Sequence, residues 1–135
     1  MTVYDASYAA VPHLIRIAAV SNQNPHYSFF LLPAAIEISR AMGYGRPLAD
    51  DLAEAYHHAI QQLPLVASRF ADAPWDEALT RSIATAVAVA KGHILLADSV
   101  MDLRPETIEE YYQWKGWTYH QAYLRDHNAA SASDG

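Results

Sequence analysis

The feature that most constrains the fold is an apolar stretch between Leu79 and Val100. Its apolar side chains recur every three or four residues, which is the spacing of one face of an α-helix. This face contains Leu79, Ile83, Val87, Ala90, Ile94, Ala97 and Met101. A second set, Val89, Leu96 and Val100, lies off the face, so we expect neighbouring helices to cover the segment on more than one side. The stretch predicts a central helix of an all-α protein, and the side chains expected to be almost wholly buried are Ile83, Val87, Ile94 and Leu96.

Polar residues within this stretch exclude a membrane-spanning helix. Lys91 and His93 interrupt the apolar run, whereas a span needs roughly 20 consecutive apolar residues. We therefore expect no membrane association. The chain of 135 residues is 52% apolar and 18% charged, which is typical of a globular domain. Its first residues contain no basic region followed by an apolar run, so we expect no secretion signal and a cytoplasmic protein.

Boundary signals divide the chain into about five helices. These fall at about residues 8–20, 25–42, 47–70, 74–103 and 105–126, with the central stretch as the fourth. Gly43 ends the second helix. Prolines that bend a helix or mark its start lie in the first three helices, at Pro12, Pro33 and Pro64. We expect one domain over residues 1–126 and a disordered tail over residues 127–135, which are small and polar.

Residues 2–14 carry a phrase that connects the chain to a known group of proteins. The phrase is TVYDASYAAVPHL, from Thr2 to Leu14, and it resembles a segment of uncharacterised bacterial proteins with HEAT-like helical repeats. In those proteins similar residues lie inside a longer chain, whereas here they follow Met1. The resemblance implies helix pairs packed as in an α-solenoid and brings no catalytic residues. Together with the helix pattern, it favours antiparallel neighbours in a short HEAT-like array or an irregular helical bundle.

Two patterns define the alternative of a metal-binding or enzymatic helical bundle. Glu54 and His57 have the Glu-x-x-His spacing that places both side chains on one helix face, and di-iron bundles use this pair twice. Here the pair occurs once, on the polar face of its helix, where a solvated surface is the favoured interpretation. His93 lies in the central helix as a base, a ligand or, in the favoured interpretation, a hydrogen-bonded core residue. We expect no metal site, cofactor or catalytic residue, since cysteine and the common catalytic motifs are also absent.

The balance of charge limits the classes of partner. Lysine and arginine total nine residues without a cluster, and the formal net charge is -6. The phosphates of a nucleic acid would be repelled, so we expect no nucleic-acid binding. Glu106, Glu109 and Glu110 favour a protein partner with a basic surface. One such partner is a toxin whose basic active site an acidic antidote covers.

The most distinctive candidate interface is the aromatic segment of the last predicted helix, which contains Tyr111, Tyr112, Trp114, Trp117, Tyr119 and Tyr123. Tyrosine and tryptophan dominate interface cores because each buries a large area and keeps a polar atom. The alternative is a C-terminal latch that covers the domain's own core. We predict an interaction or assembly module, not an enzyme, which forms a homo-oligomer, most simply a dimer. Its expected interface contains Tyr112, Trp114, Trp117, Tyr119 and Tyr123, with the first helix as the second choice.

Overall fold

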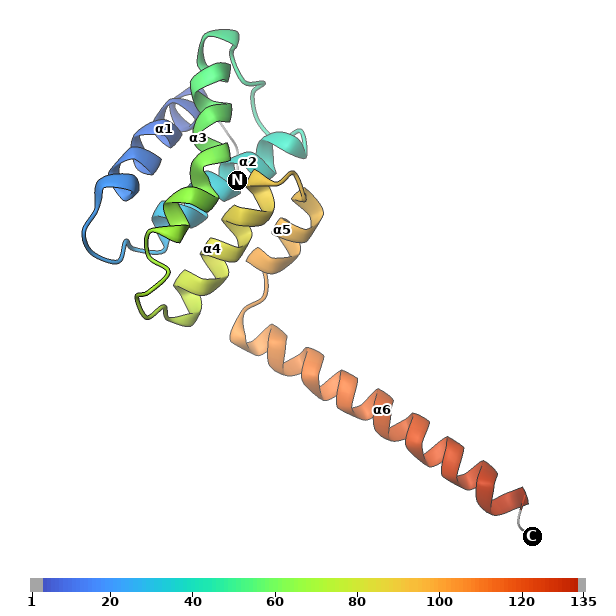
Figure 1. The fold of residues 1–135 in the computed structure, drawn as a ribbon. Coiled ribbons are helices and arrows are strands. Elements are labelled where there is room, and N and C mark those ends of the chain that lie inside the picture. Colours follow the sequence, from blue (N-terminus) through green and yellow to red (C-terminus); the bar gives the residue numbers. More distant parts are fainter. Residues whose placement is uncertain (1–3, 134–135) are drawn as a thin grey trace. The chain divides into compact units, whose positions relative to one another are not determined.

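Six helices make up the computed structural model, which describes residues 4–133 and the side chains of residues 4–128. The helices are α1 (Asp5–Val20), α2 (Ser28–Ala41), α3 (Asp50–Ser68), α4 (Glu77–Ala90), α5 (Ile94–Met101) and α6 (Pro105–Ser133) (Figure 1). The described residues between them form turns and loops, without a strand. The predicted all-α fold is confirmed, with one helix more than expected.

The chain divides into two compact units, Met1–Met101 with α1 to α5 and Asp102–Gly135 with α6. The single domain that the sequence predicts up to residue 126 stays a prediction. The division falls in the short connection before Pro105, where the proline disfavours a helical conformation of the preceding Arg104. No helix in the described part of the chain is both long and apolar enough to cross a membrane.

Two layers of helices form most of the first unit. α1 packs against α3, α2 packs against α4, and successive helices run in opposite directions (Figure 1). α5 packs against α4 and α2. The sequence predicts antiparallel neighbours in a helical array or bundle, and this packing confirms the expectation. A relation to HEAT-like repeats stays a prediction.

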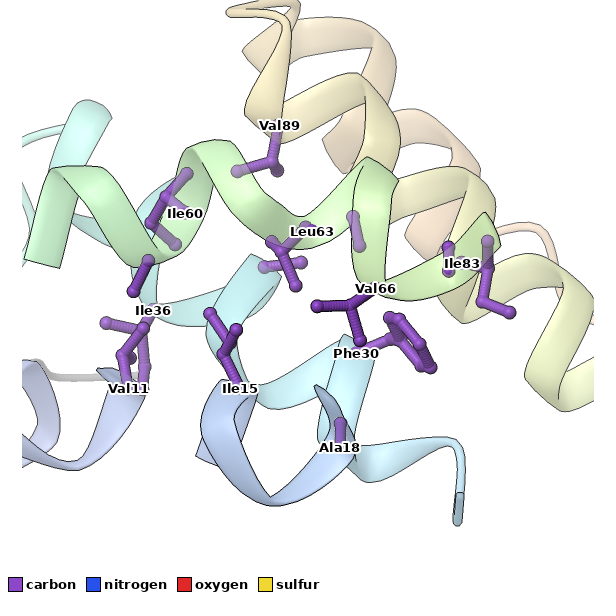
Figure 2. Packing of buried hydrophobic residues seen from close by; sticks show 14 of the residues in the cluster. Val11, Ile15, Ala18, Phe30, Ile36, Ile60, Leu63, Val66, Ile83 and Val89 are labelled. Atoms are coloured by element: carbon purple, nitrogen blue, oxygen red, sulfur yellow. The ribbon is translucent and has the colours of Figure 1, made fainter. Parts of the chain in front are cut away.

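The hydrophobic core of the first unit forms where these helices face one another. Val11, Ile15 and Ala18 are spaced by four and three residues, so they share one face of α1, and all three are buried. Figure 2 shows this face opposite Leu63 and Val66 of α3, which are also buried. Each fully buried valine, leucine or isoleucine side chain contributes about 1.5–3 kcal/mol to folding. The α1–α3 pairing therefore follows from two matching apolar stripes.

α4 has a defined signal at each end. The carboxylate of Asp76 caps its start by accepting a hydrogen bond from the Leu79 N–H at 2.8 Å. At its end Gly92 has a φ of +84°, and the His93 N–H donates to the Ala88 carbonyl oxygen at 2.9 Å. This is a Schellman motif, in which a glycine in the left-handed conformation closes the helix.

The glycine turn overturns the prediction of one central helix through Val100. Ile83 is 5% exposed, as predicted, and Val87 and Ile94 are partly buried. The prediction for Leu96 was wrong, because this residue lies on α5 and is 57% exposed. His93 is exposed in the turn and is therefore not a core histidine. The apolar spacing continues on both sides of Gly92 although the helix does not.

Proline and glycine signals elsewhere give mixed outcomes. Pro12, Pro33 and Pro64 lie inside continuous helices, so none of them marks a helix start. Gly43 follows the end of α2 as predicted, with a φ of +82°. Gly116 lies inside α6 without breaking it. α6 continues to Ser133, where the sequence predicts a disordered tail from residue 127, and residues 134–135 lie outside the described part.

Replacing Gly92 by alanine should lower the free energy of unfolding of the first unit by about 1–2 kcal/mol, because a Cβ atom disfavours the left-handed conformation. An added Cβ would meet no other atom within 4 Å, so the loss comes from the backbone alone. Urea unfolding measures the effect. The matched control is Gly116→Ala, which changes a helical position and should leave that transition unchanged. Equal midpoints for Gly92→Ala and the unsubstituted protein would contradict the turn's role.

Candidate functional site

α6 carries the five aromatic residues of the predicted interface on one continuous helix of 29 residues. Because successive residues are rotated by about 100°, the helix separates these aromatics into two groups on opposite sides. We define the tyrosine face as Ile108, Tyr112, Lys115, Tyr119 and Tyr123, and the tryptophan face as Glu106, Glu110, Trp114, Trp117, Gln121 and Leu124. The predicted interface residues therefore do not share one side of the helix, and a flat partner surface reaches only one face at a time.

A lysine lies at the centre of the tyrosine face. Lys115 Nζ lies 5.9 Å from the ring centroid of Tyr112 and 5.7 Å from that of Tyr119. Both distances allow a cation–π interaction, which contributes about 0.5–1 kcal/mol at exposed sites. The face thus combines aromatic area with a fixed positive charge.

The tryptophan face combines large apolar rings with acidic residues. Trp114 and Trp117 are 60% and 62% exposed. Glu106 and Glu110 lie one to three turns before them, near the helix N-terminus, where a carboxylate is favoured by the helix dipole. The face is therefore apolar in its middle and negatively charged at its start.

The second unit has no core of its own, because it consists of one helix. An isolated helix is only marginally stable in water, since most helical stability in proteins comes from packing of an apolar face. Six exposed aromatic rings on α6 are consequently a large apolar area without cover from within this unit.

Of the residues of the metal-binding or enzymatic alternative, two share one helix and the third lies in a different part of the first unit. Glu54 and His57 are exposed on α3, and His93 is exposed in the turn between α4 and α5. Among the described residues, no group of three or more histidine, aspartate or glutamate side chains is arranged to hold a metal ion. The structure therefore does not assemble Glu54, His57 and His93 into one site.

A buried polar cluster that the sequence pattern does not predict joins α2 to α3. Glu37 of α2 is 7% exposed. Arg40 donates to both of its carboxylate oxygens, through Nε at 2.8 Å and Nη2 at 2.7 Å, and the Tyr56 hydroxyl of α3 donates to Oε2 at 2.6 Å. Such a bidentate, charge-assisted arrangement is among the stronger pairings in proteins. The available sequence signal was a glutamate three residues before an arginine within an apolar helix.

Tyr8 extends this cluster to α1. Its ring meets the Tyr56 ring edge-on, with centroids 5.3 Å apart, and its hydroxyl donates to the Arg46 carbonyl oxygen at 2.7 Å. Burial raises the pKa of Tyr8, and burial together with the hydrogen bond to Glu37 raises the pKa of Tyr56. The hydrogen bond to Glu37 also raises the pKa of Arg40. Both tyrosines therefore keep their protons at neutral pH, and the cluster holds three helices together.

Comparison of the chain with known protein families found no match, and comparisons with curated proteins and with solved structures found none either. The HEAT-like resemblance of residues 2–14 accordingly stays a prediction.

Tyr56→Phe should lower the free energy of unfolding by about 1.5–3 kcal/mol, because it removes a hydrogen bond to a buried carboxylate. Chemical denaturation measures the change. Tyr44→Phe is the control, since Tyr44 is exposed and should change stability by less than about 0.5 kcal/mol. An equal loss in the free energy of unfolding for both variants would contradict the hydrogen bond from Tyr56 to Glu37.

The raised pKa values of Tyr8 and Tyr56 predict a loss of stability at alkaline pH. A tyrosine in the unfolded chain ionises near pH 10. The folded state keeps these protons to higher pH. The contribution of the two tyrosines to the free energy of unfolding is therefore complete below about pH 10 and falls as the pH rises above it. Urea midpoints measured between pH 8 and pH 11 should decline less steeply for Tyr56→Phe than for Tyr44→Phe. Parallel declines would refute the assignment.

Proposed function

We propose that the protein is an interaction or assembly module that forms a homodimer through α6. The observation that carries this proposal is the exposed aromatic area of a helix that has no core within its own unit. A self-associating helix gains the cover that its own unit does not supply. Twofold pairing is the commonest closed arrangement of identical chains.

The two aromatic faces of α6 together offer an area comparable to that of a stable dimer interface. A buried aromatic side chain covers roughly 150–250 Å², so six of them offer on the order of 1,000 Å². A standard interface buries about 800 Å² on each partner. Even one of the two faces, together with its flanking residues, supplies a substantial part of that area.

A basic protein partner, as in an antidote-type complex, is the second candidate. It is supported by Glu106, Glu109 and Glu110 in the first two turns of α6. The two candidates differ in one measurable respect, because a chain that serves only a different partner is monomeric when pure. The mass of the pure protein in solution therefore separates them.

Sedimentation equilibrium at micromolar concentration should give the mass of a dimer. Trp114→Ala combined with Trp117→Ala should weaken association by roughly 100-fold or more, since central aromatic residues commonly contribute 2 kcal/mol or more each. Tyr112→Ala combined with Tyr119→Ala tests the other face in the same way. Tyr44→Ala, which removes an exposed aromatic ring of the first unit, is the control and should leave the dimer intact.

Two results would count against the proposal. A clean monomer at these concentrations leaves α6 as a latch or as the binding site for a different protein. A dimer that survives both pairs of substitutions places the interface elsewhere in the chain.

A further inference from the structure

An apolar groove runs between α1 and α3 in the first unit. Its volume is about 330 Å³, and its apolar lining includes Ile15, Ala19, Ala59 and Val66. The alanines leave space for bulky side chains from outside. Leu65 also lines the groove and is 64% exposed. The groove therefore has the character of surfaces that accept the apolar face of a helix.

Two arginines line this groove, and Arg69 lies at one end of it. The described residues that line it include Arg16 and Arg69 and no acidic residue. Arg69 is held at the end of α1, where Nη1 and Nη2 each lie 3.5 Å from a carbonyl oxygen, of Ala18 and Ser21 respectively. Arg16 is exposed and has no ion-pair partner among the described residues. The groove is thus locally basic on a chain whose formal net charge is -6.

The tryptophan face of α6 has the complementary chemistry. Glu106 and Glu110 match the arginines in charge, and Trp114 and Trp117 match the alanine-lined part of the groove in size and polarity. The tyrosine face does not match, because Lys115 at its centre would face the groove's own cations.

The two surfaces also agree in length and in direction. The α3 side of the groove extends from Ala55 to Arg69, which is about 21 Å of helix. The tryptophan face from Glu106 to Gln121 is about 22 Å long. We place α6 antiparallel to α3, with Gln121 opposite Ala55. In this register Trp117 lies opposite Ala59, and Glu106 at the start of α6 reaches Arg69.

We propose that the groove between α1 and α3 binds the tryptophan face of α6 from a second copy of this chain, with α6 antiparallel to α3. The proposal rests on the homodimer proposed above and names the surface that accepts α6. Two such contacts, one in each direction, form a closed twofold dimer and leave neither groove empty.

Cross-linking between copies tests the contact, because the chain contains no cysteine. A chain with Ala55→Cys is mixed with a chain with Gln121→Cys and treated with a short bismaleimide. The expected result is a mixed covalent dimer, formed at least 10-fold more than with the control Ala122→Cys. Ala122 is the next residue along α6 and points away from the tryptophan face.

Charge reversal supplies a second, independent measurement. Arg16→Glu should weaken dimerisation at least 10-fold in sedimentation equilibrium, and adding Glu110→Arg, which leaves Glu106 opposite Arg69, should restore most of the loss. Circular dichroism of each variant confirms that the chain remains folded.

The outcomes separate this inference from the proposed function. A dimer that needs Trp114 and Trp117 but gives no Ala55–Gln121 cross-link retains α6 self-association and overturns the groove as its acceptor. A monomer overturns both proposals. A third outcome is a cross-link that forms only when both cysteines are on one chain, with no mixed product. It overturns both proposals, because α6 then covers its own chain.

Discussion

The arrangement of the first three helices depends on the hydrogen bonds that the buried carboxylate of Glu37 accepts. This carboxylate lies on α2, accepts hydrogen bonds from Arg40 on the same helix, and accepts a third from Tyr56 on α3. Tyr56 in turn packs against Tyr8 of α1. Removing one partner of a buried ion pair commonly costs about 3–5 kcal/mol, because the remaining charge stays out of water. The polar cluster therefore fixes how α2 and α3 align, while the apolar stripes supply most of the favourable free energy.

Local rules in the sequence were sufficient for most of the first unit. Gly43 ends α2 as its position predicts, and Val11 and Ile15 are buried as their spacing predicts. The central stretch shows where such rules fail, since an apolar period continues through Gly92 although the chain turns there. Periodicity reports which side chains are apolar, but a single left-handed glycine decides where the helix ends. The predicted burial of Leu96 was wrong for this reason.

Tertiary features of the candidate site were harder to predict. The aromatic residues of α6 were recognisable as a group, but their division into two faces depends on Gly116 remaining helical. The Glu37 cluster joins residues 19 positions apart, and no local pattern reveals that Tyr56 donates to that carboxylate. Glu54 and His57 form a recognisable motif, and both are exposed on α3, as their position on its polar face indicates. Spacing within one helix identifies a shared face but not what that face meets.

The two opposed faces of α6 give this helix two surfaces of different chemistry. In the dimer that we propose, a reciprocal exchange through the tryptophan faces fills both grooves and stops at two chains. The ring-flanked lysine of the tyrosine face takes no part in that exchange and offers a second point of attachment with different chemistry. In the proposed dimer, each copy therefore keeps one such basic-aromatic ridge outside the exchange.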